Sequence, residues 1–590
     1  MICIGLSTMG SSSASIFKDD KLLFAVEEER LSRIKNDASF PIKSIKECLE
    51  KTNIAVEDVD YICVYWKPYN FLGRTLRFTK KIVLSPYFIS FYFKRINTAI
   101  FSNSNKNNYA DFNGRWLDLF KIKKIFDKKI GIFKGNVKFI DHHMSHQSYC
   151  KALANNENSL NLSFDGGGEN YSTKIVLIKN GNKKTLKNIK WPNSLGHFYS
   201  YFTGFLGFTM LEGEYKMMGL APYGKHKYLK TIQDHILVLN KNGEYNFNHN
   251  LCDYHLALQG IYSDKVKNLF FANRQKDQKI TSEHIDLAAS VQKAFELALE
   301  NMLNWCKKKY PDIHLLNISG GCALNVTANG KILSKKIFSK INVTPASNDA
   351  GCSIGAVINF RESKNLNVDS NSIKSPYLGS SFENKEIEKT FQSLNLSKPI
   401  ILSHEDMIEK ISGELAEKKI IAWFQGASEF GPRALGNRSF LADPRDDEIR
   451  NVLNSKIKKR ELFRPFAPSI LDYKLKDYFH TEVLSPYMSL VSKVKNEMKF
   501  QIPAVVHIDG TSRVHSVSKE MNPLYYNLIN AFYKKTGVPV LLNTSLNIQE
   551  PIVYSPKDAI KTFFNSNVDY LCIGNYLCDL KWKNNNMSNI

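Results

Sequence analysis

Residues 426–469 contain the densest group of side chains capable of chemistry. This segment has the sequence GASEFGPRALGNRSFLADPRDDEIRNVLNSKIKKRELFRPFAPS, in which glycines and prolines predict a series of turns. Because guanidinium forks match phosphate and carboxylate groups, we predict an anion site here rather than a solvated basic loop. The segment interleaves cationic and acidic side chains. Its principal cations are Arg433, Arg438, Lys458, Arg460 and Arg464, and its two interleaved acids are Glu429 and Glu461.

Two histidines four residues apart form a second candidate site. His142 and His146 follow a predicted strand at 137–140, and on a helix they would share one face. Asp165 ends a later predicted strand and opens the turn DGGGE. Two imidazoles and a carboxylate suit iron, zinc or manganese better than calcium. The alternative is a histidine cluster in a polar crevice that holds no ion.

Glycine turns could bring backbone amides close to phosphate oxygens. Gly166 and Gly167 follow Asp165, and Gly320–Gly321 lies between a predicted strand and helix. Each turn is a weak signal when it is taken alone.

The surrounding elements indicate an α/β protein. Residues 2–29 predict a three-stranded β-meander, and 281–309 predicts a long amphipathic helix with apolar residues at three- and four-residue steps. The polar stretch 361–376 predicts a linker between domains at 1–365 and 376–590.

The composition excludes several classes of protein. The chain has 590 residues, 43% of them hydrophobic and 12% aromatic, which predicts a folded protein of at least two domains. Its apolar runs are too short to span a membrane, and the N-terminus lacks the features of a signal peptide. Ten cysteines without a C-x-x-C pair disfavour zinc ribbons and a disulfide framework. We therefore expect a cytoplasmic protein.

The formal net charge of +23 leaves nucleic acid, a membrane surface and an anionic substrate open as partners. Much of the surplus lies in the basic, aromatic region 67–129. This region is interpreted either as an acceptor-recognition or peripheral membrane surface, or as a packed helical insertion with a solvated lysine face, which we favour. Because the chain shows no known nucleic-acid-binding pattern, we expect no nucleic-acid partner.

Several of these motifs resemble the nodulation/cephamycin-type O-carbamoyltransferases. EFGPRALGNRS and KKRELFRPFAP are similar to that family's signature, and LEGEYKMMGLAPYG at 211–224 matches a further motif. Glu214 and Lys216 of that motif are candidate ligand contacts. Family members carry a His-Asp pair where this chain has Gly10 and Ser11. The resemblance covers nearly the whole chain apart from 70–130 and 225–280.

The resemblance implies an α/β fold with an N-terminal actin/hexokinase-like (ASKHA) duplicated domain and a C-terminal YrdC-like α/β domain. It also implies one divalent transition metal, iron first and otherwise zinc or manganese, with His143 outside the ligand set. The implied ligands are His142, His146, Asp165 and Asp349.

The activity implied by the resemblance is ATP-dependent synthesis of carbamoyl adenylate from carbamoyl phosphate. The carbamoyl group would then pass to a hydroxyl of a sugar, a sugar-containing natural product or a glycan. The implied catalytic residues are Arg433, Lys458, Arg464, Arg513, Asn543 and Ser545. The candidate cofactor-binding residues are Gly166, Gly167, Glu214, Lys216, Gly320, Gly321, Arg438 and Arg460. An actin-fold sugar kinase or ATPase, a tRNA-modifying carbamoyl-adenylate enzyme, and assembly as a homodimer stay open as alternatives.

Overall fold

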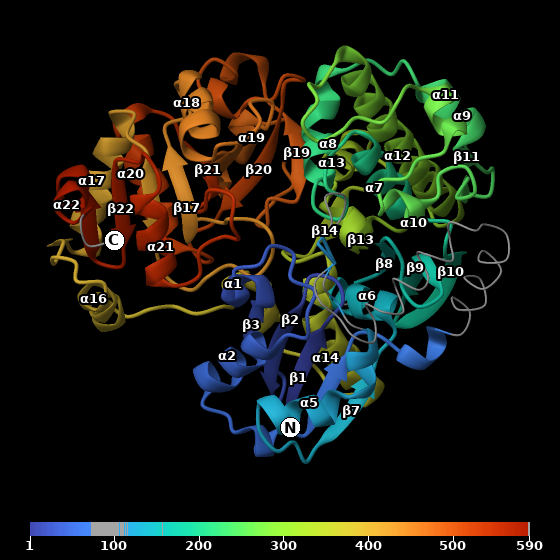
Figure 1. Ribbon diagram of the computed structural model, residues 1–590, viewed down its shortest axis with the longest axis horizontal. Coiled ribbons are helices and arrows are strands. Elements are labelled where there is room, and N and C mark those ends of the chain that lie inside the picture. The colour runs from blue at the N-terminus through green and yellow to red at the C-terminus, as the bar shows by residue number, and fades with distance from the viewer. Residues whose placement is uncertain (72–104, 107–110, 113, 115, 156, 588–590) are drawn as a thin grey trace. The chain divides into compact units, whose positions relative to one another are not determined.

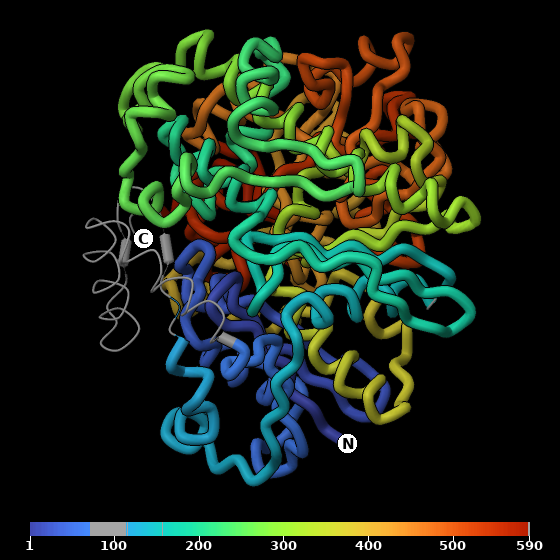
Figure 2. The backbone as a smooth tube through the Cα atoms, turned by 90° about the vertical axis from the view of Figure 1, so that its right-hand side faces the viewer, coloured from blue at the N-terminus to red at the C-terminus, as the bar shows by residue number. Residues whose placement is uncertain are grey.

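The described part of the chain forms two compact units. Unit 1 comprises residues 1–32 and 36–374, and unit 2 comprises 33–35 and 375–590. The computed structural model describes the whole chain apart from the segments drawn in grey in Figures 1 and 2, which are 72–104, 107–110, 113, 115, 156 and 588–590. Half of the Lys and Arg residues of the predicted 67–129 region therefore lie outside the described residues.

Unit 1 contains two five-stranded sheets that repeat one strand order (Figure 1). In each sheet the first three strands form an antiparallel meander, and two later strands then add in parallel beside the first. The meander predicted at the N-terminus is confirmed. The first sheet runs β3 (Lys21–Glu27), β2 (Ser13–Lys18), β1 (Ile2–Ser7), β4 (Tyr61–Val64) and β7 (Asn136–Phe139). The second runs β10 (Asn182–Lys190), β9 (Tyr171–Lys179), β8 (Ser159–Phe164), β13 (Leu315–Ser319) and β14 (Lys340–Val343).

Helices α6 (His142–Leu153) and α14 (Cys352–Ser363) pack closely against one another in unit 1. A Cβ atom at Gly355 would lie 1.8 Å from the Ser145 carbonyl oxygen, so this approach requires glycine. The other helices are α1 (Glu28–Ser32), α2 (Ile42–Thr52), α5 (Ile122–Lys129), α7 (Leu195–Phe205), α8 (Glu214–Leu220), α9 (Leu229–His235), α10 (Tyr254–Ala257), α11 (Asp264–Leu269), α12 (Ser282–Lys309), α13 (Val326–Ser334) and α15 (Ser370–Lys374). The short strands are β5 (Asn105–Lys106), β6 (Asp111–Phe112), β11 (Leu237–Leu239) and β12 (Tyr245–Phe247).

The long helix predicted at 281–309 is confirmed as α12, whose first turn carries a capping box between Thr281 and His284. Among the described residues, no helix combines the length and the apolarity that a membrane crossing needs.

The division between the two units falls at 374–375, inside the predicted linker 361–376, but most of that segment is folded into unit 1. Its first three residues end α14, and α15 packs into unit 1 with Ile373 fully buried. The Arg361 guanidinium donates to the Asn367 carbonyl at 2.8 Å, and the Ser372 hydroxyl accepts from the Leu22 amide at 3.1 Å. These polar side chains bond to backbone groups of unit 1, so the segment is an ordered extension of the unit.

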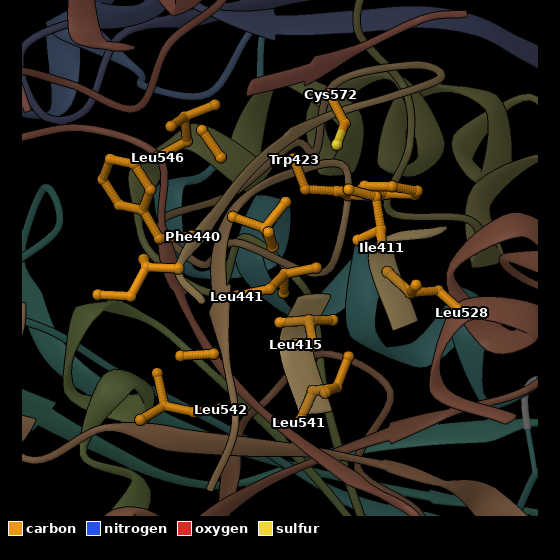
Figure 3. Close-up of a cluster of buried hydrophobic side chains, with 14 of the residues drawn as sticks. Ile411, Leu415, Trp423, Phe440, Leu441, Leu528, Leu541, Leu542, Leu546 and Cys572 are labelled. Atoms are coloured by element: carbon orange, nitrogen blue, oxygen red, sulfur yellow. The ribbon is translucent and has the colours of Figure 1, made fainter. Parts of the chain in front are cut away.

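Unit 2 is built on one mixed nine-stranded sheet. Its core includes Trp423 on the sheet, Ile411 on α17 and Leu528 on α20, all fully buried (Figure 3). In sheet order the strands are β15 (Ile400–Ile401), β23 (Tyr576–Asp579), β22 (Tyr570–Ile573), β16 (Ile421–Phe424), β17 (Arg438–Ala442), β21 (Val540–Ser545), β18 (Ala467–Leu471), β20 (Thr511–Val517) and β19 (Leu490–Lys493). The helices are α16 (Asn384–Ser393), α17 (His404–Ala416), α18 (Glu448–Asn451), α19 (Leu475–Tyr478), α20 (Pro523–Thr536), α21 (Pro556–Phe564) and α22 (Leu580–Asn585).

Only part of the cation-rich segment 426–469 consists of turns. Residues 438–442 form β17, and 448–457 form α18 and a π-helical turn at Val452–Ile457 that ends next to Lys458. The prediction of turns holds for 426–437, 443–447 and 458–466. These irregular stretches are therefore held at the ends of regular elements. Rigid elements position functional side chains better than free loops do.

Candidate active site

The four predicted metal ligands meet in unit 1. The ligand atoms of His142, His146, Asp165 and Asp349 all lie within 4.8 Å of one another. His146 Nε2 lies 3.1 Å from Asp165 Oδ2 and 3.4 Å from Asp349 Oδ1. His142 Nε2 lies 3.6 Å from Asp165 Oδ2.

The ligands are carried by the ends of regular elements. His142 and His146 lie one turn apart on α6, whose first turn is capped by the Asp141 carboxylate accepting from the Met144 amide at 2.9 Å. Asp165 directly follows β8, and Asp349 begins the short 3₁₀ turn that leads into α14. A strand of the second sheet and both packed helices therefore contribute to the geometry of the cluster.

The environment of His142 fits a bound cation. The side chain is 1% exposed, and neither ring nitrogen has a hydrogen-bond partner among the described residues. Leaving a buried polar atom unpaired costs about 1–3 kcal/mol, a cost that a coordinated ion would remove. Burial raises the pKa of Asp165, but its contacts with His142 and His146 outweigh this and hold the pKa well below the usual value. Two imidazoles and two carboxylates form a donor set for a divalent transition metal.

Two residues that sequence reasoning missed hold this cluster in place. The Glu169 carboxylate is 3% exposed and accepts from the backbone amides of Lys67 at 2.9 Å and His142 at 3.2 Å. The Tyr65 hydroxyl donates to the Thr8 carbonyl and lies 3.2 Å from Asp349 Oδ2. Burial raises the pKa of Tyr65 well above its usual value, so it remains a proton donor. Glu169 ends the DGGGE motif, whereas no motif marks Tyr65.

His143 lies outside the ligand set, as predicted. Its Nδ1 lies 3.0 Å from the Ser163 hydroxyl and its Nε2 lies 2.9 Å from the Tyr171 carbonyl oxygen. Both ring nitrogens are thus committed to protein partners.

The predicted glycine turns lie against the candidate metal ligands. Gly320 has a φ of +93°, and a Cβ atom there would come within 2.2 Å of the Phe164 carbonyl oxygen. A Cβ atom at Gly321 would lie 3.0 Å from Asp165 Oδ1, which also accepts from the Gly166 amide at 2.6 Å. A Cβ atom at Gly10 would lie 1.9 Å from Asp349 Oδ2. Close backbone approach therefore explains Gly10, Gly320 and Gly321; Gly167 follows Gly166 in the same turn.

Glu214 has a structural role that the sequence did not predict. Its carboxylate accepts from the Ser200 hydroxyl and, at 2.9 Å, from the Leu211 amide. These contacts fix the start of α8, and burial raises the pKa of the Glu214 carboxyl. Lys216 lies in the first turn of the same helix.

A buried lysine anchors the cluster of cations in unit 2. Lys458 is 1% exposed, and its Nζ contacts the Ser545 carbonyl, the Ser545 hydroxyl at 3.2 Å and the Asn547 side-chain oxygen at 2.7 Å. Burial, followed by the nearby charges of Arg460 and Arg464, lowers the pKa of Lys458 well below its usual value. Neutral oxygens thus hold the ammonium among other cations.

The Arg513 guanidinium belongs to the same cluster of cations. Burial, followed by Arg433, Arg460 and Arg464, lowers the pKa of Arg513 well below its usual value. Its Nε is buried and has no hydrogen-bond partner among the described residues. Like charges gathered out of water disfavour the charged forms, and an anion bound among them reverses this effect. The structure thus brings together Arg433, Lys458, Arg460, Arg464 and Arg513, as well as Ser545.

Arg438 does not belong to this cluster, which contradicts its prediction as a cofactor-binding residue. The side chain is fully buried and its guanidinium lies 3.7 Å from the centre of the Phe424 ring. Its terminal nitrogens donate to four backbone carbonyls, those of Ser380, Gln425, Gly426 and Asn437. Arg438 therefore shapes the 426–437 turn from inside.

Asn543 also supports the site from within the fold. It is 1% exposed, and its amide nitrogen donates to the Ala434 carbonyl at 3.1 Å and to the Ser469 hydroxyl at 3.0 Å. The first of these bonds holds Ala434, the residue that follows Arg433, in place. These contacts give Asn543 a positioning role, and its catalytic role stays a prediction.

Lys35 and Asn547 are further residues of the cluster that sequence reasoning missed. Residues 33–35 belong to unit 2, where the Arg33 guanidinium donates to the carbonyls of Pro551 at 2.7 Å and Ile552 at 2.8 Å. The charge of Lys35 adds to those that lower the pKa of Lys458. The available signals were the Ser32–Arg33 dipeptide near the N-terminus and the run of polar residues after β21.

Two family models together match most of the chain. The model described as Carbamoyltransferase N-terminus matches residues 2–358, and the model described as Carbamoyltransferase C-terminus matches residues 412–579. The chain is therefore that of an enzyme that transfers carbamoyl groups. More particularly, the chain belongs to the carbamoyltransferase family of nodulation and cephem O-carbamoyltransferase proteins.

The relatives extend over most of the chain. An uncharacterized protein of Synechocystis sp. is 35% identical over 96% of this chain and 94% of its own length. Nodulation protein NolNO of Sinorhizobium fredii is 32% identical over 98% of this chain and 82% of its own length. The 3′-hydroxymethylcephem-O-carbamoyltransferase of Amycolatopsis lactamdurans is 30% identical over 63% of this chain and 67% of its own length.

Proposed function

We propose that the protein is an ATP-dependent O-carbamoyltransferase that makes carbamoyl adenylate from carbamoyl phosphate and transfers the carbamoyl group to a sugar hydroxyl. The observation that carries this proposal is the buried cluster of cations around Lys458 in a chain of this family. Carbamoyl phosphate and ATP are both polyanions, and such a cluster suits them. A hydroxyl acceptor is supported by the relative named as a cephem O-carbamoyltransferase.

The proposal includes the finer fold assignments. Unit 1 would be an actin/hexokinase-like duplicated domain, which its repeated strand order supports. Unit 2 would be a YrdC-like domain that handles carbamoyl phosphate and ATP. The chemistry below depends on the two clusters rather than on these fold names.

Formation of the adenylate would take place among the cations of unit 2. Because carbamoyl adenylate contains one carbamoyl group and one AMP group, water first releases phosphate from carbamoyl phosphate. A carbamate oxygen then attacks the α-phosphorus of ATP, and pyrophosphate leaves. Lys458, Arg464 and Arg513 would stabilise the charge that develops on the phosphoryl oxygens, at about 2.7–4 kcal/mol per well-placed donor.

Neighbouring residues would keep these cations in position. Asn547 and Ser545 fix the Lys458 ammonium, as their contacts with Nζ indicate. The Arg460 Nε donates to Asn454 Oδ1 at 2.7 Å, and its guanidinium lies 4.7 Å from the Phe466 ring centre. Pre-positioned charge avoids reorganisation during the reaction, which is the main advantage of an enzyme site over water.

Transfer would use the cluster in unit 1. His142, His146, Asp165 and Asp349 would hold one divalent transition metal, with iron as our first expectation. When bound there, the ion would supply Lewis acidity toward a carbamoyl carbonyl. Glu169 and Tyr65 would keep His142 and Asp349 in place through the contacts described above. The acceptor hydroxyl attacks the carbonyl carbon, its proton is lost, and AMP leaves.

The proposal is tested by incubating the protein with ATP and labelled carbamoyl phosphate in the absence of any acceptor. We expect labelled carbamoyl adenylate together with pyrophosphate, and neither product when ATP or carbamoyl phosphate is omitted. Carbamoyl transfer to an acceptor that proceeds without ATP would overturn the adenylate mechanism. The family's carbamoyl transfer would still stand in that case.

A further inference from the structure

A cysteine thiol lies beside the histidines of the metal cluster. The ligand atoms of His142, His146 and Cys352 lie within 4.8 Å of one another, and all three side chains are buried. The two histidines form a separate group of the same kind with Asp165 and Asp349. The histidine pair is therefore shared by two ligand sets, one closed by carboxylates and one closed by a thiol.

The packing of two helices places this thiol. Cys352 begins α14 three residues after Asp349, so both side chains lie on one side of the helical turn. One turn further along, Gly355 lies against the Ser145 carbonyl of α6, where any side chain would collide. Because Gly355 lets the two helices approach so closely, Cys352 reaches the histidines of α6.

His142 provides independent evidence that a ligand belongs between these groups. Its side chain is 1% exposed, and neither ring nitrogen forms a hydrogen bond within the described part of the chain. The cysteine is fully buried, so solvent does not compete for its sulfur. A buried set of two imidazoles and one thiol is a chemically complete set of protein ligands for zinc, with one coordination position left open.

We propose that Cys352 gives the histidine pair a second coordination mode, in which a thiophilic divalent ion such as Zn²⁺ binds His142, His146 and Cys352. Ions that prefer oxygen ligands would bind His142, His146, Asp165 and Asp349 instead. This inference rests on the metal centre of the proposed function and deepens it by naming what selects the ion. Thiolate ligands favour zinc and other soft ions, whereas carboxylates suit manganese. On binding, the thiol gives up its proton to solvent and a sulfur–metal bond forms.

The two modes differ in charge as well as in ligand type. A divalent ion held by both carboxylates is formally neutralised, whereas the thiolate mode leaves one positive charge on the centre. Asp165 and Asp349 are then free of the metal. The choice of ion thus determines whether these two acids are ligands or free carboxylates beside the centre.

X-ray absorption at the zinc edge of the zinc-loaded full chain tests the proposal. We expect a sulfur shell at about 2.3 Å beside nitrogen or oxygen at about 2.0–2.1 Å. The manganese-loaded protein should show no sulfur shell. A zinc spectrum fitted by nitrogen and oxygen alone would overturn the thiol mode and leave the metal centre standing. A protein that binds no divalent ion would overturn both.

Cobalt loading gives a second readout with a matched control. Cobalt bound by the thiolate shows a sulfur-to-metal charge-transfer band in the near ultraviolet, which Cys352→Ser should abolish. Cys150→Ser should retain the band, because the Cys150 thiol is equally buried one turn after His146 but donates to the carbonyls of Ile318 at 3.5 Å and Asn342 at 3.3 Å.

The same variants separate ion selectivity from general damage to the fold. Cys352→Ser should lower zinc affinity by about 10–100-fold and leave manganese affinity unchanged. An equal loss for both ions would mean that Cys352 only packs, which contradicts the proposal. Should Cys352→Ser fail to fold, the zinc spectrum of the unmodified chain still decides the question.

Discussion

The two units concentrate charge of opposite sign. In unit 1, two carboxylates and two imidazoles surround a point that suits a cation. In unit 2, Lys458 and Arg513 lie among further guanidinium groups at a point that suits an anion. Both clusters contain buried polar atoms without a hydrogen-bond partner among the described residues, on His142 and on Arg513.

This contrast shows how a single chain can carry two clusters that suit ligands of opposite charge. Burying like charges or unpaired polar atoms costs free energy, which the rest of each core must supply. A ligand whose charge is opposite to that of one cluster removes this cost there. The same ligand does not bind the other cluster, whose charge has the same sign as its own. Variants that remove one cluster should therefore leave the binding properties of the other intact.

The largest expected effect is on adenylate formation. Replacing Lys458 with methionine keeps the volume of the side chain and removes its charge, so we expect the rate of pyrophosphate release to fall by about 10²–10³. Metal content should not change. Pyrophosphate release with ATP and carbamoyl phosphate, together with metal analysis of the purified variant, measures both outcomes.

Lys456→Met is the matched control, because Lys456 is exposed and lies two residues away. It should keep the activity of the unmodified chain. If Lys458→Met loses metal as well as adenylate formation, the two clusters are not independent and the comparison fails.

The converse experiment removes a ligand from unit 1. His146 contacts both Asp165 and Asp349, so His146→Ala should weaken metal binding by at least about 10–100-fold. Acceptor-free synthesis of carbamoyl adenylate should persist at the rate of the unmodified chain. His143→Gln is the control, since both nitrogens of His143 bond to protein groups outside the ligand set. Loss of adenylate synthesis in His146→Ala alone would mean that the metal takes part in both half-reactions.

A smaller effect should come from the acid that holds α6. Glu169→Gln keeps the shape of the side chain but replaces a charged acceptor of the Lys67 and His142 amides. We expect metal affinity to fall by about tenfold, the low end for a residue that supports a ligand. Calorimetric titration with a divalent metal measures it, with the exposed Glu157→Gln as control. Unchanged affinity would show that the backbone of α6 needs no such anchor.

The sequence predicted that His142, His146 and Asp165 would lie together, because the signals for this grouping are local. His142 and His146 are spaced for one helical face, and Asp165 stands at a strand end next to glycines that permit close approach. The placement of Asp349 came from the family resemblance, since nothing near it in the sequence points to His146. Cys352 was missed because it is a single cysteine, and its position depends on how closely α6 and α14 pack.

The cationic segment shows where such inference stops. Arg433 and Arg438 are five residues apart in one motif, and residue type cannot distinguish them. Arg438 instead donates to four backbone carbonyls inside the turn, a role decided by which direction β17 faces. Lys35 could not be assigned either, because more than 400 residues of chain separate it from Lys458. Long-range placement of this kind follows from packing, which short motifs do not encode.

The smallest effect is a pH dependence of stability that reports the burial of Lys458 and the positive charges around it. Burial, with Arg460 and Arg464, lowers the pKa of folded Lys458 from its ordinary 10.5. Between the lowered pKa and 10.5 the unfolded state binds the extra proton, so this group makes the folded state more stable as pH rises. Relative to Lys458→Met, the unmodified chain should gain stability toward alkaline pH, by at most about 1.4 kcal/mol per pH unit.

Thermal unfolding of both proteins over a series of pH values measures this difference, in which the effects of groups distant from Lys458 cancel. Inorganic pyrophosphate should flatten the pH dependence of the unmodified chain, because an anion among the cations raises the pKa of Lys458 toward its ordinary value. A difference that falls as pH rises would mean that an acid, rather than other cations, dominates the surroundings of Lys458. The two units would then not differ in the sign of their buried charge, and the case for a polyanion site in unit 2 would lose its physical basis.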